Sequence, residues 1–175
     1  MATITSTTTP NAAYPTSPTS VAICSFARPA DTTAYAVGDV ISDSTSTARC
    51  LVFDAGMSGE IMHAHVGYEE TKTADLELWL FDAEPTNHLD NAALALVAAD
   101  LPKIICRYSL RDSSKVTVGS GMDWREAFDA NGGLVSHPRP FASATGKLYG
   151  LLVTRTVYTP ASAKVFHVKL GLHKT

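Results

Sequence analysis

Two histidines and a glutamate stand close together in the stretch MHAHVGYEE, Met62–Glu70, and are the side chains best suited to hold a metal ion. His63 and His65 are two residues apart, so on a β-strand both imidazoles project from the same face. Glu69 follows four residues after His65. Two neutral imidazoles and a carboxylate would suit Fe(II), Mn or Zn.

This spacing resembles the first metal motif of cupins, which are β-barrel or jelly-roll proteins. The match is partial, because the opening glycine would be Gly56, one residue too early, and the closing glycine is absent. No Pro-x-Gly-x-x-His segment follows, and SHPRPF (136–141) carries His137 without that spacing. A metal site needs three or four convergent ligands. We therefore interpret His63 and His65 as surface residues and predict no metal ligand.

Other catalytic patterns are missing from the sequence. There is no Gly-x-Ser-x-Gly elbow, no phosphate-binding Gly-Lys-Ser/Thr loop and no Cys-x-x-Cys pair. The acids Glu69 with Glu70, and Asp75 with Glu77, are typical of solvated surface near turns, and spacing alone does not select a glycosidase dyad from them. We predict a protein that is not an enzyme, with no catalytic and no cofactor-binding residue.

The two tryptophans leave a sugar-binding alternative open, because aromatic rings can stack on sugars. Trp79 stands between leucines in LELWLFD, which predicts packing in the core or on a sheet face. Trp124 lies beside a charged turn and is the better candidate for an exposed ring.

The composition indicates one globular domain. The 175 residues are 45% hydrophobic and 18% charged, with a net charge of -3, which argues against a nucleic-acid surface. No apolar run approaches the roughly 18 residues of a membrane span, and the first residues lack the basic and apolar regions of a secretory signal. The three cysteines are widely spaced among apolar neighbours. They predict small buried thiols made in a reducing cytoplasm, without a disulfide framework.

Residues 1–20 form a separate segment. Thirteen of them are Ser, Thr or Pro, and no charged residue precedes Arg28. Such a composition cannot bury enough apolar surface to offset the entropy of ordering. We predict an extended N-terminal arm over 1–20 and a single domain over 21–175.

From Val21 onward the hydrophobic pattern has a period of two, which predicts β-strands. Eight segments carry it: Val21–Ala27, Cys50–Asp54, Glu60–Tyr68, Leu76–Asp82, Lys103–Leu110, Lys115–Gly119, Lys147–Arg155 and Ala163–Leu172. In the last segment Phe166, Val168 and Leu170 face one way while His167 and Lys169 face the other, as expected of an antiparallel sheet with one solvated face.

Two segments invite a short helix. Asn91–Asp100 is rich in alanine. In Met122–Ala130, Asp123 could cap a helix with Glu126 three residues on. Asp100 could cap a further turn near Pro102. Together these elements predict an all-β fold, an antiparallel jelly-roll β-sandwich with one or two short helices.

The connection RPADTTAYAVGDVIS, 28–42, is rich in turn formers. Pro29 ends the preceding strand, and Asp31 can bond the backbone of an Asx turn. We predict that Tyr35 buries its ring while its hydroxyl finds a backbone partner, and that Gly38 permits a sharp bend before Val40 begins the next strand. We interpret the stretch as a rigid corner between two strands, with a binding loop as the alternative.

The same stretch resembles the N-terminal signature of many tailed-bacteriophage virion proteins, an Arg-Pro-x-Asp-Thr-x-x-Tyr-x-x-Gly-Asp-Val run that follows the first strand. Residues 78–105 look like that family's Leu-Phe-x-x-x-Pro-Thr, Asp-Asn and Ala-Asp-Leu elements, and residues 148–170 look like its closing pair of strands. The three stretches cover rather less than half of the chain.

The resemblance implies a head decoration, or cement, protein on the outer surface of a virion, made in the cytoplasm of the host bacterium. Its implied partners are the major capsid protein and further copies of itself, as a dimer or trimer, with no nucleic acid and no membrane. A head-fibre or tail-associated protein that binds a receptor or glycan is the alternative, and a cupin-like metal-dependent enzyme is the third.

Overall fold

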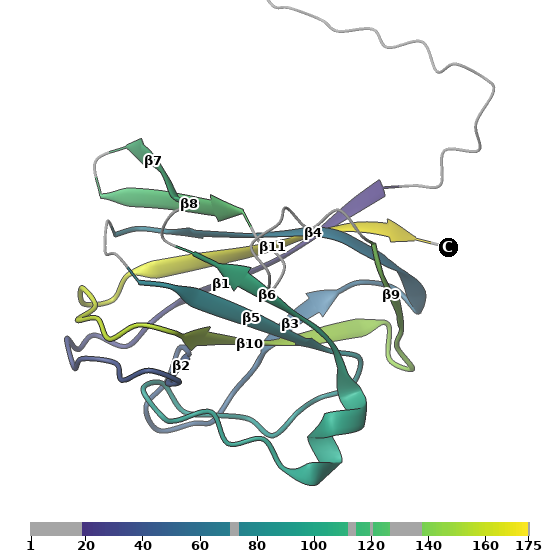
Figure 1. Cartoon of the computed structure of the whole chain (residues 1–175), viewed down its shortest axis with the longest axis horizontal. Helices are drawn as coiled ribbons and strands as arrows, with labels where there is room; N and C mark the ends of the chain where they lie inside the picture. The colour runs from purple at the N-terminus through teal and green to yellow at the C-terminus, as the bar shows by residue number, and fades with distance from the viewer. Residues whose placement is uncertain (1–18, 71–73, 112–114, 120, 127–137, 175) are drawn as a thin grey trace, which may run out of the picture.

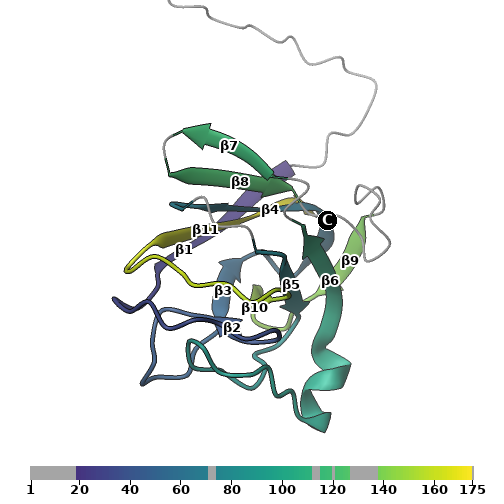
Figure 2. The ribbon, with the colours of Figure 1, turned by 60° about the vertical axis from the view of Figure 1, so that its left-hand side comes forward.

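The computed structural model describes residues 19–70, 74–111, 115–119, 121–126 and 138–174, and it is mostly β. Two antiparallel sheets lie face to face in a sandwich-like arrangement, as Figure 1 shows and Figure 2 repeats from another side. The all-β class expected from the sequence is therefore confirmed.

The first sheet has the order β1 (Thr19–Ala27), β11 (Val165–Lys174), β4 (Ser58–Tyr68), β8 (Met122–Glu126) and β7 (Lys115–Gly119), and β9 (Arg139–Ala142) also pairs with β4. The second sheet has the order β2 (Val40–Ile41), β10 (Lys147–Thr154), β5 (Leu76–Phe81) and β6 (Ile104–Leu110), and β3 (Leu51–Asp54) also pairs with β10.

One set of strand pairs is nested along the chain, and the pairs of β4 with β11 and of β5 with β10 join this set into the two sheets. The first strand, β1, pairs with the last, β11, and both β2 and β3 pair with β10. Further in, β4 pairs with β8 and β9, and β5 pairs with β6. Strands that are far apart in the sequence are thus neighbours in space, and every one of these pairs is antiparallel.

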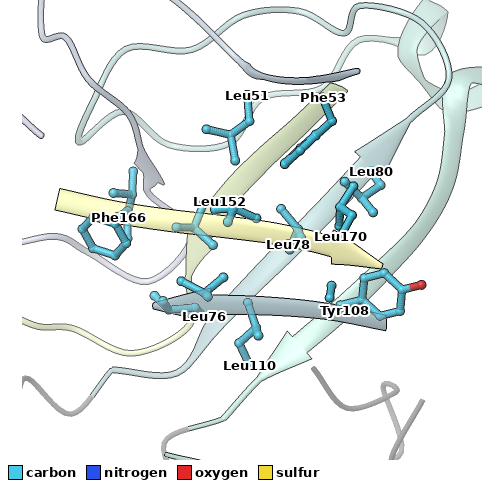
Figure 3. Close-up of a cluster of buried hydrophobic side chains, with 14 of the residues drawn as sticks. Leu51, Phe53, Leu76, Leu78, Leu80, Tyr108, Leu110, Leu152, Phe166 and Leu170 are labelled. Atoms are coloured by element: carbon cyan, nitrogen blue, oxygen red, sulfur yellow. The ribbon is translucent and has the colours of Figure 1, made fainter. Parts of the chain in front are cut away.

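The core fills the space between the two sheets, because each strand turns its alternate apolar residues inward. Figure 3 shows this cluster, to which β5 contributes Leu76, Leu78 and Leu80 and β11 contributes Phe166 and Leu170; all five are at most 2% exposed. The wet and dry faces predicted for β11 are confirmed, since His167 on the other face is exposed.

A second, smaller apolar cluster lies on the outer side of the second sheet. It contains Val40, Phe81, Leu151 and Val153, all at most 1% exposed. The two faces of β10 are therefore both covered. The cover comes partly from the segment that follows β5, because Leu94 and Leu96 pack against this cluster.

The helix predicted over Asn91–Asp100 is wrong. Asn91 has a φ of 59°, and the chain then runs in a non-helical conformation with Leu94 and Leu96 alternating with exposed neighbours. A short 3₁₀ helix, η1 (Ala98–Lys103), follows with Pro102 inside it. In the described part of the chain it is the one helical element.

The helix predicted over Met122–Ala130 is also wrong where the structure describes it. Met122–Glu126 is strand β8, whose Asp123 and Arg125 are buried and whose Met122 is exposed. Asp123 therefore caps no helix. Residues 127–130 lie outside the described residues, as does most of the predicted arm, residues 1–18. Thr19 and Ser20, which we had placed in the arm, belong to β1.

Candidate functional site

A buried cluster of polar and aromatic side chains joins the connection between β1 and β2 to other segments of the chain. We use the name corner network for Arg28, Tyr35, Asp90, Thr154 and Tyr158. Arg28 directly follows β1, and its side chain has no exposed area. Its Nε donates a hydrogen bond to the Tyr35 hydroxyl (2.9 Å), and its Nη2 donates to Asp90 Oδ2 (3.3 Å). One buried guanidinium thus links the start of the connection to a carboxylate that is far away in the sequence.

Asp90 is the acceptor at the centre of the network. Its Oδ1 accepts hydrogen bonds from the Tyr35 hydroxyl (2.6 Å) and from the backbone amide of Ser42 (2.8 Å). Burial raises the pKa of the Asp90 carboxyl, although the hydrogen bonds from Ser42 and Tyr35 and the charge of Arg28 act in the opposite direction. Burial together with the bond to Asp90 also raises the pKa of the Tyr35 phenol well above its usual range.

Tyr35 joins the network to the connection between β10 and β11. Its ring is fully buried and stacks on the Tyr158 ring at a centroid distance of 5.2 Å, and its amide donates to the Tyr158 carbonyl. The predicted burial of the ring is confirmed. The predicted backbone partner for the hydroxyl is wrong, because the hydroxyl bonds to the side chains of Arg28 and Asp90.

The remaining turns of the connection are held by short polar contacts. Asp31 Oδ1 accepts from the Thr33 amide (3.1 Å), which confirms the Asx-type turn. Gly38 has a φ of 94°, a left-handed conformation that favours glycine. The Thr154 hydroxyl donates to the carbonyl of Ala36 (2.7 Å). These contacts support the rigid corner over the binding loop, because the polar groups are used within the fold.

The outer face of the first sheet carries the residues that had suggested chemistry. His63 and His65 lie on β4 with ring centroids 4.7 Å apart, and His65 stacks on Trp124 of β8 at 5.1 Å. Trp124 lies against Gly67, where an added Cβ would come within 3.0 Å of Trp124 Cε3. The Lys169 ammonium is 6.0 Å from the Trp124 ring centroid. The sequence predicted an exposed ring for Trp124. In the structure this side chain is half-buried, so the prediction is only partly right.

Among the described residues, no three His, Cys, Asp or Glu side chains form a group that could hold a metal ion. Strand β4 brings His63 and His65 together, and the neighbour of His65 on the next strand is the Trp124 ring. His137 lies outside the described residues.

A second polar cluster, on the outer face of the second sheet, was not anticipated. Glu77 Oε1 lies 3.2 Å from Arg155 Nε and 3.6 Å from Arg107 Nη1. The Trp79 indole donates to Glu77 Oε2 (3.2 Å), and the Arg107 guanidinium lies over the Trp79 ring. Trp79 therefore packs on a sheet face, as predicted. The signal available was the alternation of Glu77 and Trp79 with the leucines of β5.

The three thiols are unpaired and half-buried. Burial raises the pKa of Cys50 to about 12 and that of Cys106 to about 11, so neither forms the reactive thiolate readily at neutral pH. Cys24 helps to line a pocket of about 230 Å³ between β1 and β3, together with Phe26 and Leu51.

No helix in the described part of the chain is long and apolar enough to cross a membrane. No protein-family model matches the chain, and no curated protein matches it significantly.

Proposed function

We propose that this chain is a non-enzymatic structural protein of a tailed-bacteriophage virion, a decoration (cement) protein that binds the outer surface of the head and stabilises the lattice of the major capsid protein. Its partners would be the major capsid protein and further copies of itself, as a dimer or trimer, with no nucleic acid and no membrane. It would be made in the host cytoplasm. An arm that ends before β1, over residues 1–18, would accompany a single domain over the rest of the chain.

The observation that carries this proposal is the meeting of the three stretches that resemble phage virion proteins. Arg28 and Tyr35 belong to the first stretch, Asp90 to the second, and Thr154 and Tyr158 to the third. Hydrogen bonds join Arg28, Tyr35 and Asp90, and the Tyr158 ring stacks on the Tyr35 ring. Thr154 adds a hydrogen bond to the carbonyl of Ala36, the residue that follows Tyr35. A resemblance spread over distant segments is better supported when the matching residues build one structural unit.

We also propose that the sandwich is a jelly roll. The support is the nested pairing, in which β1 lies beside β11, β2 and β3 beside β10, β4 beside β8, and β5 beside β6. A jelly roll arises when a long antiparallel hairpin rolls into two sheets. Because jelly rolls serve many functions, this fold by itself does not select decoration.

In the proposed mechanism the protein bridges neighbouring capsid subunits. A ligand that binds only the assembled lattice stabilises it by mass action, and many copies multiply a modest contact into a large effect. Shape and repeated surface contact would then supply the stabilisation, with no reacting group.

The test is to locate the chain on particles of the phage or prophage that encodes it. We expect mass spectrometry of purified virions to detect the chain in many copies, and electron microscopy of a tagged copy to label the outside of the head. Label on the tail or a fibre would favour the alternative position. Absence from assembled particles would refute the proposal.

Glycan binding is the second candidate, and the half-buried Trp124 ring beside Lys169 on an outer sheet face favours it. A glycan array with the purified protein, repeated with Trp124→Ala, tests it: binding that the substitution removes would support a receptor-binding role.

The cupin-like enzyme is tested by metal analysis of the purified protein. If the alternative holds, the analysis should find about one equivalent of transition metal that His63→Ala removes; a metal-free preparation would argue against it.

A further inference from the structure

Strand β1 is a long edge strand without a charged residue, a proline or a bulge. It ends the first sheet and pairs only with β11 among the described strands, in nine consecutive pairs without a bulge. Its sequence TSVAICSFA contains no charge and no proline. Natural sheets blunt such edges with charges, prolines, bulges or short strands, because an open edge can pair with another chain.

The other sheet edges in the described part of the chain carry such devices. At the opposite end of the first sheet, β7 begins with Lys115 and has an irregular register against β8. In the second sheet, β6 presents Arg107, whose side chain is 38% exposed. On the other side, β2 has two residues and β3 has four. β1 is thus the long, uncharged exception.

The backbone of β1 also offers its hydrogen-bonding groups to a partner. The Arg28 amide, just after the strand, donates to the Lys164 carbonyl on the β11 side. Since amides alternate in direction along an antiparallel strand, those of Val21, Ile23 and Ser25 point away from β11, to the open side. The side chains of Val21 and Ile23 are 53% and 60% exposed. Within the described part of the chain, the same residues combine backbone amides that no strand pairs with exposed apolar side chains.

We propose that β1 pairs with β1 of a second copy of this chain, antiparallel across a two-fold axis near Ile23, so that the two first sheets become one continuous sheet. Full overlap of the nine residues places the two Ile23 side chains next to each other on the outer face, with Val21 beside them. This contact is isologous, as in most symmetric dimers. The proposal rests on the proposed function for its biological setting, and it specifies a dimer where that function allows a dimer or a trimer.

Charge favours a second copy as the occupant. No charged residue precedes Arg28 in the chain, so two β1 strands meet without like charges. The nearest cations on that face are the two Lys169 side chains, each paired with Ile23 of its own β1. The two β1 strands separate them by about 14 Å at the usual strand spacing, which exceeds the Debye length of about 8 Å at physiological salt.

The test measures the mass of the purified full chain by light scattering or analytical ultracentrifugation. We expect twice the 18.6 kDa of one chain for the wild type and the mass of a single chain for Ile23→Lys, which places two charges at the axis. Val116→Lys is the matched control, because Val116 lies on the same sheet at β7 with 59% exposure; it should remain a dimer. Ile23→Val should also remain a dimer.

Amide hydrogen exchange followed by NMR gives a second, residue-level measurement. In the wild type the amides of Val21, Ile23 and Ser25 should exchange slowly, and in Ile23→Lys they should exchange quickly while the core of β11 stays protected, which shows that the variant is folded. A monomeric or trimeric wild type, a dimeric Ile23→Lys, or fast exchange at these three amides would overturn the proposal. Since no capsid is present, these outcomes are separate from failure of the decoration function.

Discussion

Arg28 and Asp90 form an ion pair whose side chains have no exposed area. Removing one partner of a buried pair leaves the other charge without compensation. We therefore expect Asp90→Ala to lower the free energy of unfolding by about 3–5 kcal/mol, measured by urea denaturation. Tyr35→Phe, which removes one hydroxyl from the same network, should lower the free energy of unfolding by about 1–3 kcal/mol.

Asp31 provides the control for this prediction. Its carboxylate lies 3.4 Å from the same guanidinium but is 32% exposed, and partly exposed ion pairs contribute about 0–1 kcal/mol. Asp31→Ala also loses the turn contact to Thr33. We therefore expect it to lower the free energy of unfolding by somewhat more than the ion pair alone contributes. An Asp90→Ala protein as stable as Asp31→Ala would show that the corner network does not hold the fold.

At the residue scale the sequence predicted local contacts better than distant ones. The turn at Asp31, the bend at Gly38 and the buried Tyr35 ring follow from chemistry within a few residues, and the structure agrees with each. Asp90 lies 55 residues beyond Tyr35, and nothing in the spacing of charges selects it as the partner. Long-range polar pairs are set by the packing of the sheets, which alternation alone does not specify.

At the element scale, the strands were predictable because their alternation is a direct consequence of burying one face. The conformation of Asn91–Asp100 was not predictable in this way, because its alanines and leucines favour a helix in isolation. Tertiary contacts override that preference: the Leu94 amide donates to the Gly38 carbonyl, and Leu96 packs on the outer side of the second sheet.

The helix predicted where strand β8 lies is wrong for a different reason. Asp123 and Arg125 alternate with Met122 and Trp124, but the charged pair faces inward. Arg125 donates to the backbone carbonyls of Ala74 and Leu110, and Asp123 accepts from Thr117 (3.0 Å). The Asp123 carboxylate thus bonds to β7 and caps no helix, and a strand that buries its charges with such partners lacks the apolar alternation that identifies a strand.

The 3₁₀ helix η1 depends on one carboxylate, and this gives a prediction about pH. Asp100 Oδ1 accepts from the Thr86 amide (3.1 Å) and from Lys103 Nζ (3.0 Å), and Oδ2 accepts from the Val97 amide (3.1 Å). These hydrogen bonds, that from Thr86 foremost, lower the pKa of Asp100 below its ordinary value of 3.8. A carboxyl group whose pKa is lower in the folded state stabilises the fold above the unfolded pKa and loses that contribution as the pH falls.

We expect Asp100→Asn to be less stable than the wild type at pH 7, since the amide loses the charge and one acceptor oxygen. The difference should shrink as the pH falls through 3.8 toward the lower pKa of the folded protein. Melting temperatures of both proteins across a pH series measure this. Curves that stay parallel from neutral to acid pH would show that Asp100 does not carry the effect.

At the scale of the whole molecule, the nested pairing joins the two ends of the domain. β1 and β11 are the first and last strands, and β11 lies between β1 and β4. Sequence periodicity predicted a sandwich of antiparallel strands, but it could not give their order, because alternation reports which face is buried and not which strand is the neighbour. Contacts between distant segments of this kind make folding slow relative to helical proteins.

The arm adds a prediction that separates folding from function. The backbone pairing of β1 begins at Thr19 with His173, so removal of residues 1–18 leaves every described strand intact. Ser, Thr and Pro dominate the removed segment, and such a composition contributes little to a core. We therefore expect the truncated protein to unfold at the same urea concentration as the full chain.

On capsids the same truncation should have a large effect, if the arm acts as a strap that adds main-chain hydrogen bonds along a neighbouring subunit. We expect the affinity for purified heads that lack the protein to fall at least about tenfold, which corresponds to about 1.4 kcal/mol, measured by occupancy as a function of concentration. The dimer should persist, because β1 is retained, and this controls for indirect loss of avidity. Equal occupancy of heads by the truncated and full-length proteins would refute the strap and leave the folded domain as the sole contact with the capsid.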